Sequence, residues 1–184
     1  MAQVVHSINV TVNGGCYHED VVADREHHEY ALDLLRSASF VLLGRGTFDL
    51  FKDFWPGAAT REDLPPHVTD FARELSRKRK HVLSSRALTT DWENTFLLRG
   101  PSLDPLRKVL ADTSGKVVVF GSPSLGASLV TAGLLNELHV VLQPFISAAG
   151  PKAYEGVEGR RIFSLVESRP FESGVVLLRY VAAA

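Results

Sequence analysis

The sequence predicts an α/β fold built on a mixed β-sheet that is mostly parallel and has an antiparallel C-terminal end. Two observations carry this prediction. As far as about residue 142, short apolar runs typical of buried strands alternate with segments whose apolar residues recur at helical spacing. Residues 161–166 and 175–181 then have strand-like composition with no helical pattern between them. The alternation therefore ends in a pair of antiparallel strands.

The first half of the chain is predicted to contain three strands and three helices. Turn signals and apolar periodicity set their limits, and Asp24 is a plausible N-cap. The expected elements are a strand over 4–12 with a turn at 13–15, a helix from 24 to about 38, a strand over 40–43, a helix from about 47, a loop from 56 to 66, a helix containing 68–75 and a strand over 81–84.

The second half continues the same alternation before its antiparallel end. Ser102 is expected to cap one helix, and Gly133 is expected to end another at its C′ position. The expected elements are a strand over 95–98, a helix with its apolar face within 103–110, a strand over 116–120, a helix from 122 or 124 to about 132, and a strand over 137–142.

Length and composition indicate one ordinary soluble domain spanning residues 1–184. The 184 residues include 20 basic and 21 acidic side chains, and 45% of them are hydrophobic. We therefore expect neither a nucleic-acid nor a membrane partner. The most basic stretch, residues 77–81, follows a helical pattern and is interpreted as the solvated end of a helix whose dipole it favours.

The cysteine content and the N-terminal segment favour a cytoplasmic protein. Cys16 is the only cysteine, which excludes an internal disulfide and a Cys-x-x-Cys site. The segment MAQVVHSINV lacks the basic start and apolar core of a signal peptide, and no stretch approaches the roughly 20 apolar residues that span a bilayer. We expect a reducing environment.

Three strand-to-helix or strand-to-loop junctions are rich in glycine or serine. They are 44–47 (GRGT), 84–86 (SSR) and 121–124 (GSPS). In open α/β sheets, ligands bind beyond the carboxyl ends of strands, where helix N-termini present N–H groups. Each junction alone is more typical of a simple turn, and neither the dinucleotide fingerprint nor the P-loop motif is complete. Taken together, they favour an extended phosphorylated ligand.

The order of these motifs resembles the dihydrofolate-reductase-like superfamily. A first strand with its turn, then LLGRGTFDLF, KHVLSS and VVVFGSPSLGASLVTAGLLNELHVVLQPFI, match over roughly residues 4–180. The branch most similar is the reductase domain of riboflavin biosynthesis, the RibD C-terminal domain, with its small stand-alone relatives. The resemblance implies a three-layer α/β/α fold and an NADPH-dependent reductase. Such an enzyme transfers hydride to a small heterocycle, here a pterin or a 5-amino-6-ribosylaminouracil-like compound.

The resemblance also implies a cofactor site and a homodimer. NADPH is expected in place of NADH, because an arginine near the ribose favours the 2′-phosphate. No metal site is expected, because the Pro-Cys-x-x-Cys partner of His27-His28-Glu29 is missing. The implied contacts are Gly44, Arg45, Gly46 and Thr47 on the pyrophosphate, Ser84, Ser85 and Arg86 by the 2′-phosphate, and Gly121, Ser122, Ser124 and Leu125 on the pyrophosphate and the nicotinamide side.

The proton donor is the open question of this prediction. The family commonly carries an acid at the turn after the first strand, where this chain has Asn13, and an amide does not release a proton as a carboxylic acid does. Asn13 and Asp49 are the catalytic candidates, and residues 18–20 (HED) are possible substitutes. Two alternatives stay open: a non-catalytic NADPH- or nucleotide-binding module that has lost turnover, and a flavin-dependent relative.

Overall fold

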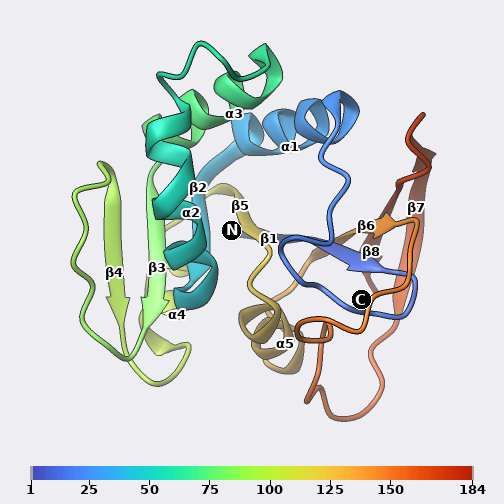
Figure 1. The fold of residues 1–184 in the computed structure, drawn as a ribbon. Coiled ribbons are helices and arrows are strands. Elements are labelled where there is room, and N and C mark those ends of the chain that lie inside the picture. Colours follow the sequence, from blue (N-terminus) through green and yellow to red (C-terminus); the bar gives the residue numbers. More distant parts are fainter. Residues whose placement is uncertain (1, 184) are drawn as a thin grey trace. The chain divides into compact units, whose positions relative to one another are not determined.

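The computed structural model describes residues 2–183, which form eight strands and five helices. In chain order they are β1 (Ala2–Thr11), α1 (Arg25–Ser37), β2 (Ala38–Gly44), α2 (Arg45–Ala58), α3 (Pro66–Arg77), β3 (Lys80–Ser84), β4 (Thr95–Arg99), α4 (Asp104–Ala111), β5 (Gly115–Phe120), α5 (Pro123–Thr131), β6 (Glu137–Gln143), β7 (Phe163–Pro170) and β8 (Val176–Ala182). Figure 1 shows these elements along the chain.

The strands confirm the predicted mixed sheet. They hydrogen-bond in the order β4-β3-β2-β5-β1-β6-β8-β7. Strands β2, β3 and β4 pair in parallel, as do β1 and β6, whereas β8 runs antiparallel to both β6 and β7. Backbone contacts divide the described residues into two compact units, one mainly of residues 25–118 and the other of residues 3–24 and 119–183.

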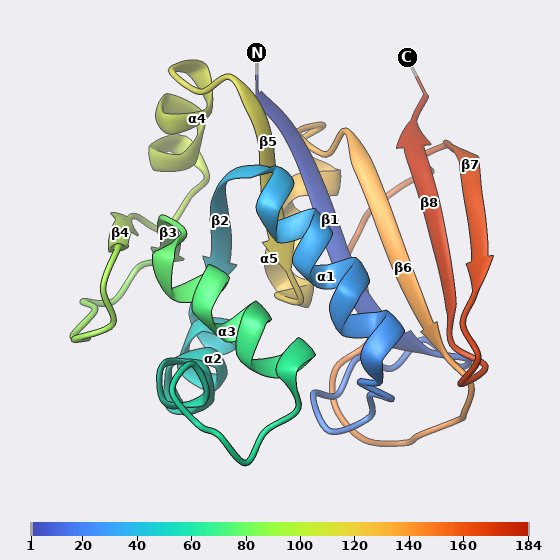
Figure 2. The same cartoon turned by 90° about the horizontal axis from the view of Figure 1, so that it is seen from above.

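The first unit contains the parallel strands β2, β3 and β4 with helices α1 to α4. Helices α1 and α3 pack along each other (Figure 2). The buried run in β2, residues 40–43, has the uninterrupted apolar character expected of a central strand. Helix α3 begins with Pro66 in its first turn, where a missing N–H costs nothing.

Lys80 is fully buried in the first unit and completes the end of α3. Its Nζ donates hydrogen bonds to the carbonyls of Leu75 (3.0 Å), Ser76 (3.2 Å) and Lys78 (2.9 Å). The ammonium also lies 4.5 Å from the centroid of the Trp92 ring. Burial lowers the pKa of Lys80 to about 8. The basic stretch after α3 thus includes a cation that satisfies the carbonyls at the negative end of the helix.

The second unit contains β1, β6, β8 and β7 with helix α5. The burial of β6 alternates, with His139, Val141 and Gln143 buried. Gln143 Nε2 donates to Asn9 Oδ1 at 3.0 Å, and Gln143 Oε1 accepts from the Val22 amide at 2.8 Å. Strand β7 lies at the end of the strand order and is largely exposed. A long loop connects β6 to β7 and returns against the turn that follows β1.

The predicted element limits differ most from the structure in α2 and β7. Helix α2 continues through Pro56 and Gly57 to Ala58, where a loop was expected, because Trp55 of its last turns packs on Phe71 of α3. Strand β7 extends to Pro170, beyond the expected residue 166, because its ladder with β8 continues that far. Within residues 2–183, no helix is both long enough and apolar enough to cross a bilayer.

Candidate functional site

The first unit carries a helix start with an open approach to its backbone. Strand β2 ends at Gly44, which occupies the N-cap position of α2, and no side chain caps this helix within the described residues. At Gly46 the position of a Cβ would have nothing within 4 Å. The first N–H groups of a helix lack intrahelical acceptors and carry the positive end of its dipole. This end of α2 therefore suits an anion.

The structure joins this helix start to the second predicted cofactor segment. The Ser84 hydroxyl accepts from the Arg86 amide and donates to the Arg86 carbonyl, both at 3.1 Å, which forms a tight turn after β3. Ser85 and Arg86 are exposed. Arg45 Nη1 donates to the Ala87 carbonyl at 2.8 Å. Residues 44–47 and 84–86 therefore lie together at one end of the β2–β3 pair.

Asp49 is engaged by cations of its own helix. Its Oδ2 accepts from Arg45 Nε at 2.7 Å, and its Oδ1 lies 3.6 Å from Lys52 Nζ. Arg45 is thereby held between a carboxylate at one nitrogen and the Ala87 carbonyl at another. These two hydrogen bonds fix the direction of the Arg45 guanidinium, and the Asp49 carboxylate serves to orient it.

The second unit carries the other predicted cofactor turn, between β5 and α5. Gly121 (φ 54°) and Ser122 (φ 56°) both have left-handed backbone, which serine rarely adopts and which costs about 1 kcal/mol. Ser122 is the N-cap of α5, but its hydroxyl donates to the Phe120 carbonyl and accepts no capping hydrogen bond from the helix amides. Pro123 has no N–H, so the amides of Ser124 and Leu125 are the open donors of this helix start.

His6 of β1 lies directly beneath this turn and is completely buried. Its Nε2 lies 2.5 Å from the Gly121 carbonyl, and the Gly121 amide donates to the Ser7 carbonyl at 2.9 Å. A Cβ at Gly126 of α5 would lie 2.1 Å from His6 Cε1. Glycine at 126 is therefore required for α5 to approach the imidazole.

The hydrogen bonds of His6 define its tautomer. A carbonyl only accepts, so Nε2 must carry the proton that binds Gly121. Nδ1 then accepts from the Tyr154 hydroxyl at 2.8 Å. Burial lowers the pKa of His6 to about 4, so the ring is neutral near pH 7. Burial also raises the pKa of Tyr154, which keeps its hydroxyl a donor. Every ring nitrogen of this buried imidazole is satisfied.

Tyr154 belongs to a loop that is attached to the turn after β1. The Cys16 amide donates to the Pro151 carbonyl at 2.9 Å, and the Ala153 amide donates to the Gly14 carbonyl at 3.0 Å. The Cys16 thiol also donates to the Pro151 carbonyl, at 3.1 Å, and its pKa is raised by burial and by the nearby Glu155. These bonds fix the loop immediately before Tyr154.

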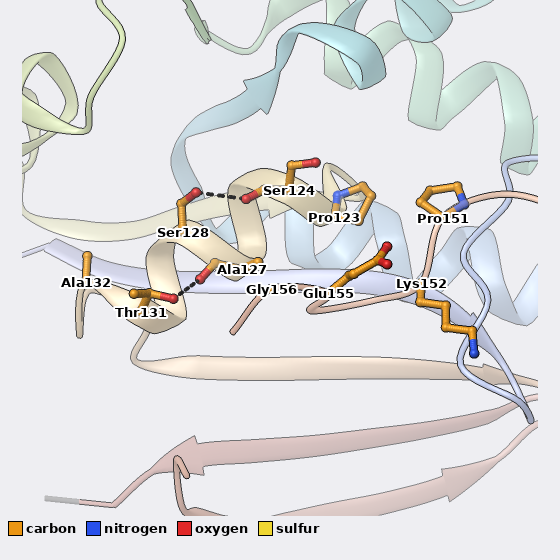
Figure 3. Close-up of a pocket in the computed structure, with 10 residues that line it drawn as sticks. All are labelled: Pro123, Ser124, Ala127, Ser128, Thr131, Ala132, Pro151, Lys152, Glu155 and Gly156. Atoms are coloured by element: carbon orange, nitrogen blue, oxygen red, sulfur yellow. Dashed lines mark hydrogen bonds between the residues drawn. The ribbon is translucent and has the colours of Figure 1, made fainter. Parts of the chain in front are cut away.

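A pocket of about 460 Å³ lies between α5 and this loop (Figure 3). Hydroxyls line the helix side, where Ser128 donates to the Ser124 carbonyl at 2.9 Å and Thr131 to the Ala127 carbonyl at 2.9 Å. The lining residues are Pro123, Ser124, Ala127, Ser128, Thr131, Ala132, Pro151, Lys152, Glu155 and Gly156. Of the predicted site residues, only Ser124 borders this pocket.

Asn13 is used to close the turn after β1. Its Oδ1 accepts from Thr11 Oγ1 at 2.8 Å and from the Ser147 amide at 3.2 Å, and its Nδ2 donates to the Ser147 carbonyl at 2.8 Å. The amide therefore fits the backbone of residue 147 from both directions. Asp20, farther along the same loop, has a buried Oδ2 with no hydrogen-bond partner among residues 2–183.

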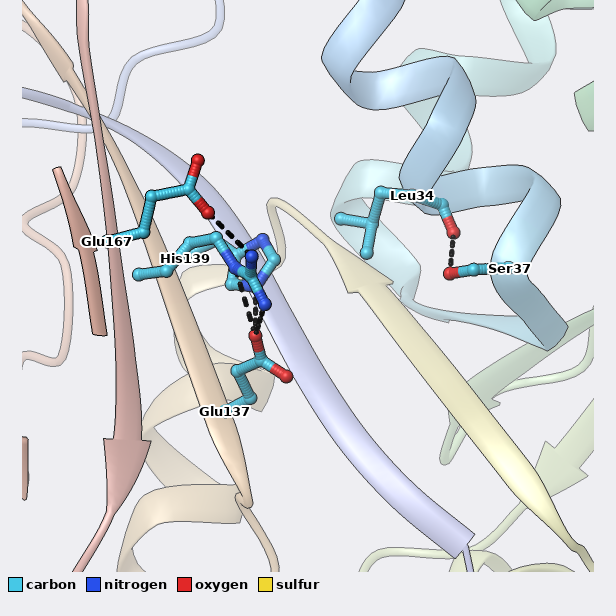
Figure 4. Close-up of polar contacts among 6 residues, drawn as sticks. Leu34, Ser37, Glu137, His139 and Glu167 are labelled. Atoms are coloured by element: carbon cyan, nitrogen blue, oxygen red, sulfur yellow. Dashed lines mark hydrogen bonds and ion pairs between the residues drawn. The ribbon is translucent and has the colours of Figure 1, made fainter. Parts of the chain in front are cut away.

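A polar network lies on the β6–β8–β7 part of the second unit (Figure 4). Arg179 donates from Nη2 to Glu137 Oε1 at 2.7 Å and from Nη1 to Glu167 Oε2 at 2.6 Å. His139 Nε2 lies 2.8 Å from Glu137 Oε1. Hydrogen bonds from His139 and Arg179 lower the pKa of Glu137 against the opposing effect of burial. The network joins three neighbouring strands and has a structural role.

Sequence reasoning missed His6, Gly126 and Tyr154. One signal was present: a histidine interrupts the apolar residues of β1 in the segment VVHSINV. Tyr154 lies 148 positions from His6, so no local pattern could pair them. Within residues 2–183, no group of three or more His, Cys, Asp or Glu side chains is arranged to hold a metal ion.

Comparison with known proteins identifies the class and then the family. The fold is dihydrofolate-reductase-like: the chain aligns over 99% of its length with 97% of an Enterococcus faecalis dihydrofolate reductase complexed with NADP(H) and RAB-propyl (TM-score 0.62, 14% identity). A pyrimidine reductase-like protein from Corynebacterium diphtheriae aligns with a TM-score of 0.70 and 14% identity, over 99% of this chain and 92% of the other.

The sequence comparisons agree with the fold. The chain is 24% identical over 148 residues to the uncharacterized protein YyaP of Bacillus subtilis (strain 168), which covers 80% of this chain and 76% of that protein. The family model of the RibD C-terminal domain matches residues 11–177. The chain therefore belongs to the RibD C-terminal domain family, which confirms the resemblance found in the sequence.

Proposed function

We propose that this protein is an NADPH-dependent reductase that transfers hydride to a small heterocyclic substrate, a pterin or a 5-amino-6-ribosylaminouracil-like compound. Membership of a family with a reductase-type fold supports the reaction class. The observation that carries the cofactor assignment is that both helix starts, α2 and α5, follow a strand and lack side-chain caps. An extended dinucleotide has phosphates to bind at such ends.

The residues at these ends fit an anionic cofactor. In the first unit, Arg45 is directed by Asp49 and Ala87, and Arg86 is exposed beside the Ser84 turn. A guanidinium pairs with phosphate in a bidentate manner, so Arg86 is the candidate for a 2′-phosphate. In the second unit, the amides of Ser124 and Leu125 are the donors for the pyrophosphate. This donor set favours NADPH over NADH.

The chain's own part in the reaction is to bind and orient. NADPH, when bound, supplies the hydride from nicotinamide C4. Within its own unit, each helix start can hold a phosphate, and a held phosphate limits where the rest of the cofactor lies. Asn13 and Asp49 are both held in other contacts, so we propose that the proton comes from residues 18–20 or from ordered water. The single reduced cysteine is compatible with a cytoplasmic enzyme.

A cofactor titration tests the proposal that the protein binds NADPH in preference to NADH. NADPH and NADH are titrated separately while nicotinamide fluorescence is followed. We expect NADPH to bind at least tenfold more tightly than NADH, and Arg86→Ala to remove most of that difference. Arg99→Ala, an exposed arginine at the end of β4, is the matched control and keeps the preference. A folded protein that binds neither cofactor would contradict the proposal.

The second candidate is a non-catalytic NADPH- or nucleotide-binding module. The specific observation in its favour is that the Asn13 amide and the Asp49 Oδ2 atom already accept or donate hydrogen bonds within the protein. A panel of dihydrofolate and the riboflavin pyrimidine intermediate, assayed by NADPH absorbance, separates the two candidates. NADPH binding without oxidation across the panel favours the module. Oxidation of NADPH with any one substrate favours the reductase.

A further inference from the structure

We propose that His6 and Tyr154 are positioning residues that set the backbone of the Gly121–Ser122 turn for ligand binding. This inference deepens the proposed function and rests on it. His6 is completely buried and Tyr154 is half-buried, and both act through the backbone of the turn. The imidazole of His6 is hydrogen-bonded to the Gly121 carbonyl of the turn, and the Tyr154 hydroxyl is hydrogen-bonded to the imidazole.

Both backbone groups of Gly121 are hydrogen-bonded to residues of β1. The carbonyl accepts from His6 Nε2 at 2.5 Å, and the amide donates to the Ser7 carbonyl at 2.9 Å. A peptide held at both groups has little freedom to rotate. Gly121 and Ser122 then keep the left-handed conformation in which α5 starts at Pro123. The open amides of Ser124 and Leu125 follow in a fixed direction.

Tyr154 determines which tautomer His6 adopts. A neutral imidazole carries its proton on either ring nitrogen, and only the Nε2–H form donates to Gly121. The Tyr154 hydroxyl donates to Nδ1 at 2.8 Å and so selects that form. Without this donor, Nδ1 would be a buried acceptor with no partner, and the alternative tautomer would lose the bond to Gly121.

The imidazole of His6 is packed closely against helix α5. His6 is completely buried, and its ring stands where a Cβ at position 126 would be. Tyr154 is itself held by the bonds of its loop to residues 14 and 16. The imidazole therefore lies between a glycine of α5 and a fixed phenol. These contacts are more specific than packing of a core strand requires, because apolar side chains would fill the space without orienting the Gly121 carbonyl.

Two measurements on Tyr154→Phe test the proposal. The first is amide hydrogen exchange in the ligand-free protein. We expect about tenfold faster exchange at the Gly121 and Gly126 amides, with the amides of β6 unchanged. The second is the Kd for NADP⁺ by calorimetry, which we expect to rise about tenfold, the effect of one lost buried hydrogen bond. Tyr180→Phe in β8 is the matched control and should alter neither quantity.

The outcomes separate this proposal from the proposed function. If Tyr154→Phe behaves as Tyr180→Phe in both measurements, the positioning role is wrong. Uniformly faster exchange throughout the second unit would also overturn it, because that result describes general destabilisation. If the wild-type protein binds neither NADPH nor NADP⁺, the proposed function fails. The exchange at Gly121 and Gly126 then decides alone whether His6 and Tyr154 position the turn.

Discussion

The neutral state of His6 makes folding stability depend on pH. Its pKa is about 4 in the folded protein, lowered by burial from 6.5. Between these values the unfolded chain binds the proton and the folded protein does not, so stability is complete above pH 6.5 and decreases as the pH falls towards 4. The shift corresponds to about 3 kcal/mol. Urea unfolding at pH 7.0 and 4.5 measures the loss. A His6 ring resonance that titrates near pH 6.5 would contradict this prediction.

Asn13 is predicted to stabilise the turn after β1. In Asn13→Asp, a carboxylate oxygen would face the Ser147 carbonyl that now accepts from Nδ2. We expect the free energy of unfolding at pH 7 to fall by about 1 kcal/mol, the value of one hydrogen bond. NADPH oxidation should not increase. The difference from wild type should narrow below about pH 3.9, where the protonated carboxyl can donate. An unchanged free energy of unfolding in Asn13→Asp would refute this role.

For single residues, the sequence predicted features that depend only on neighbouring positions in the chain. Gly121 and Ser122 were conspicuous because glycine and serine after an apolar strand are typical of a turn with unusual backbone. The partners of Asn13 and His6 were not predictable. Ser147 and Tyr154 lie in a long loop whose return to β1 depends on the folded sheet and leaves no periodic trace.

The end of α3 depends on a cation that follows the helix. Lys80 donates to three carbonyls of the last turn and of the connection to β3. In Lys80→Met these carbonyls lose their common donor, and we expect the free energy of unfolding to fall by about 2 kcal/mol, in the range of hydrogen bonds to charged groups. Urea unfolding measures the change. The exposed Arg77→Met on the same helix is the control, and an equal loss there would contradict the prediction.

Among whole elements, the sequence predicted the order and type of the strands and helices, because burial imposes their periodicity directly. The ends were less predictable. Helix α2 passes through Pro56 because aromatic contacts to α3 stabilise its last turns, and such contacts are absent from the local sequence. The predicted cap of α4 at Ser102 was wrong, because Leu103 occupies the N-cap, although Ser102 Oγ accepts from the Asp104 amide at 3.2 Å.

For the whole molecule, we propose a homodimer formed through β7. This strand is last in the sheet order, and Leu165 and Val166 are 53% and 54% exposed. An edge strand with exposed apolar side chains favours pairing with another chain. We expect sedimentation to show a dimer at micromolar concentration and the L165K/V166K variant to be monomeric. Ile146→Lys, at an exposed apolar residue outside β7, is the control and should remain dimeric.

Because His6 packs against Gly126, the size of the side chain at either position limits the size tolerated at the other. The imidazole fills the volume that any side chain at 126 would enter, with only 2.1 Å between an added Cβ and His6 Cε1. Gly126→Ala should therefore be tolerated only when residue 6 is shortened, for instance to serine. A double-mutant cycle over the two sites should show strong coupling. Among divergent relatives, this pair should change together, and proteins that keep a histidine at the first position should keep glycine at the second.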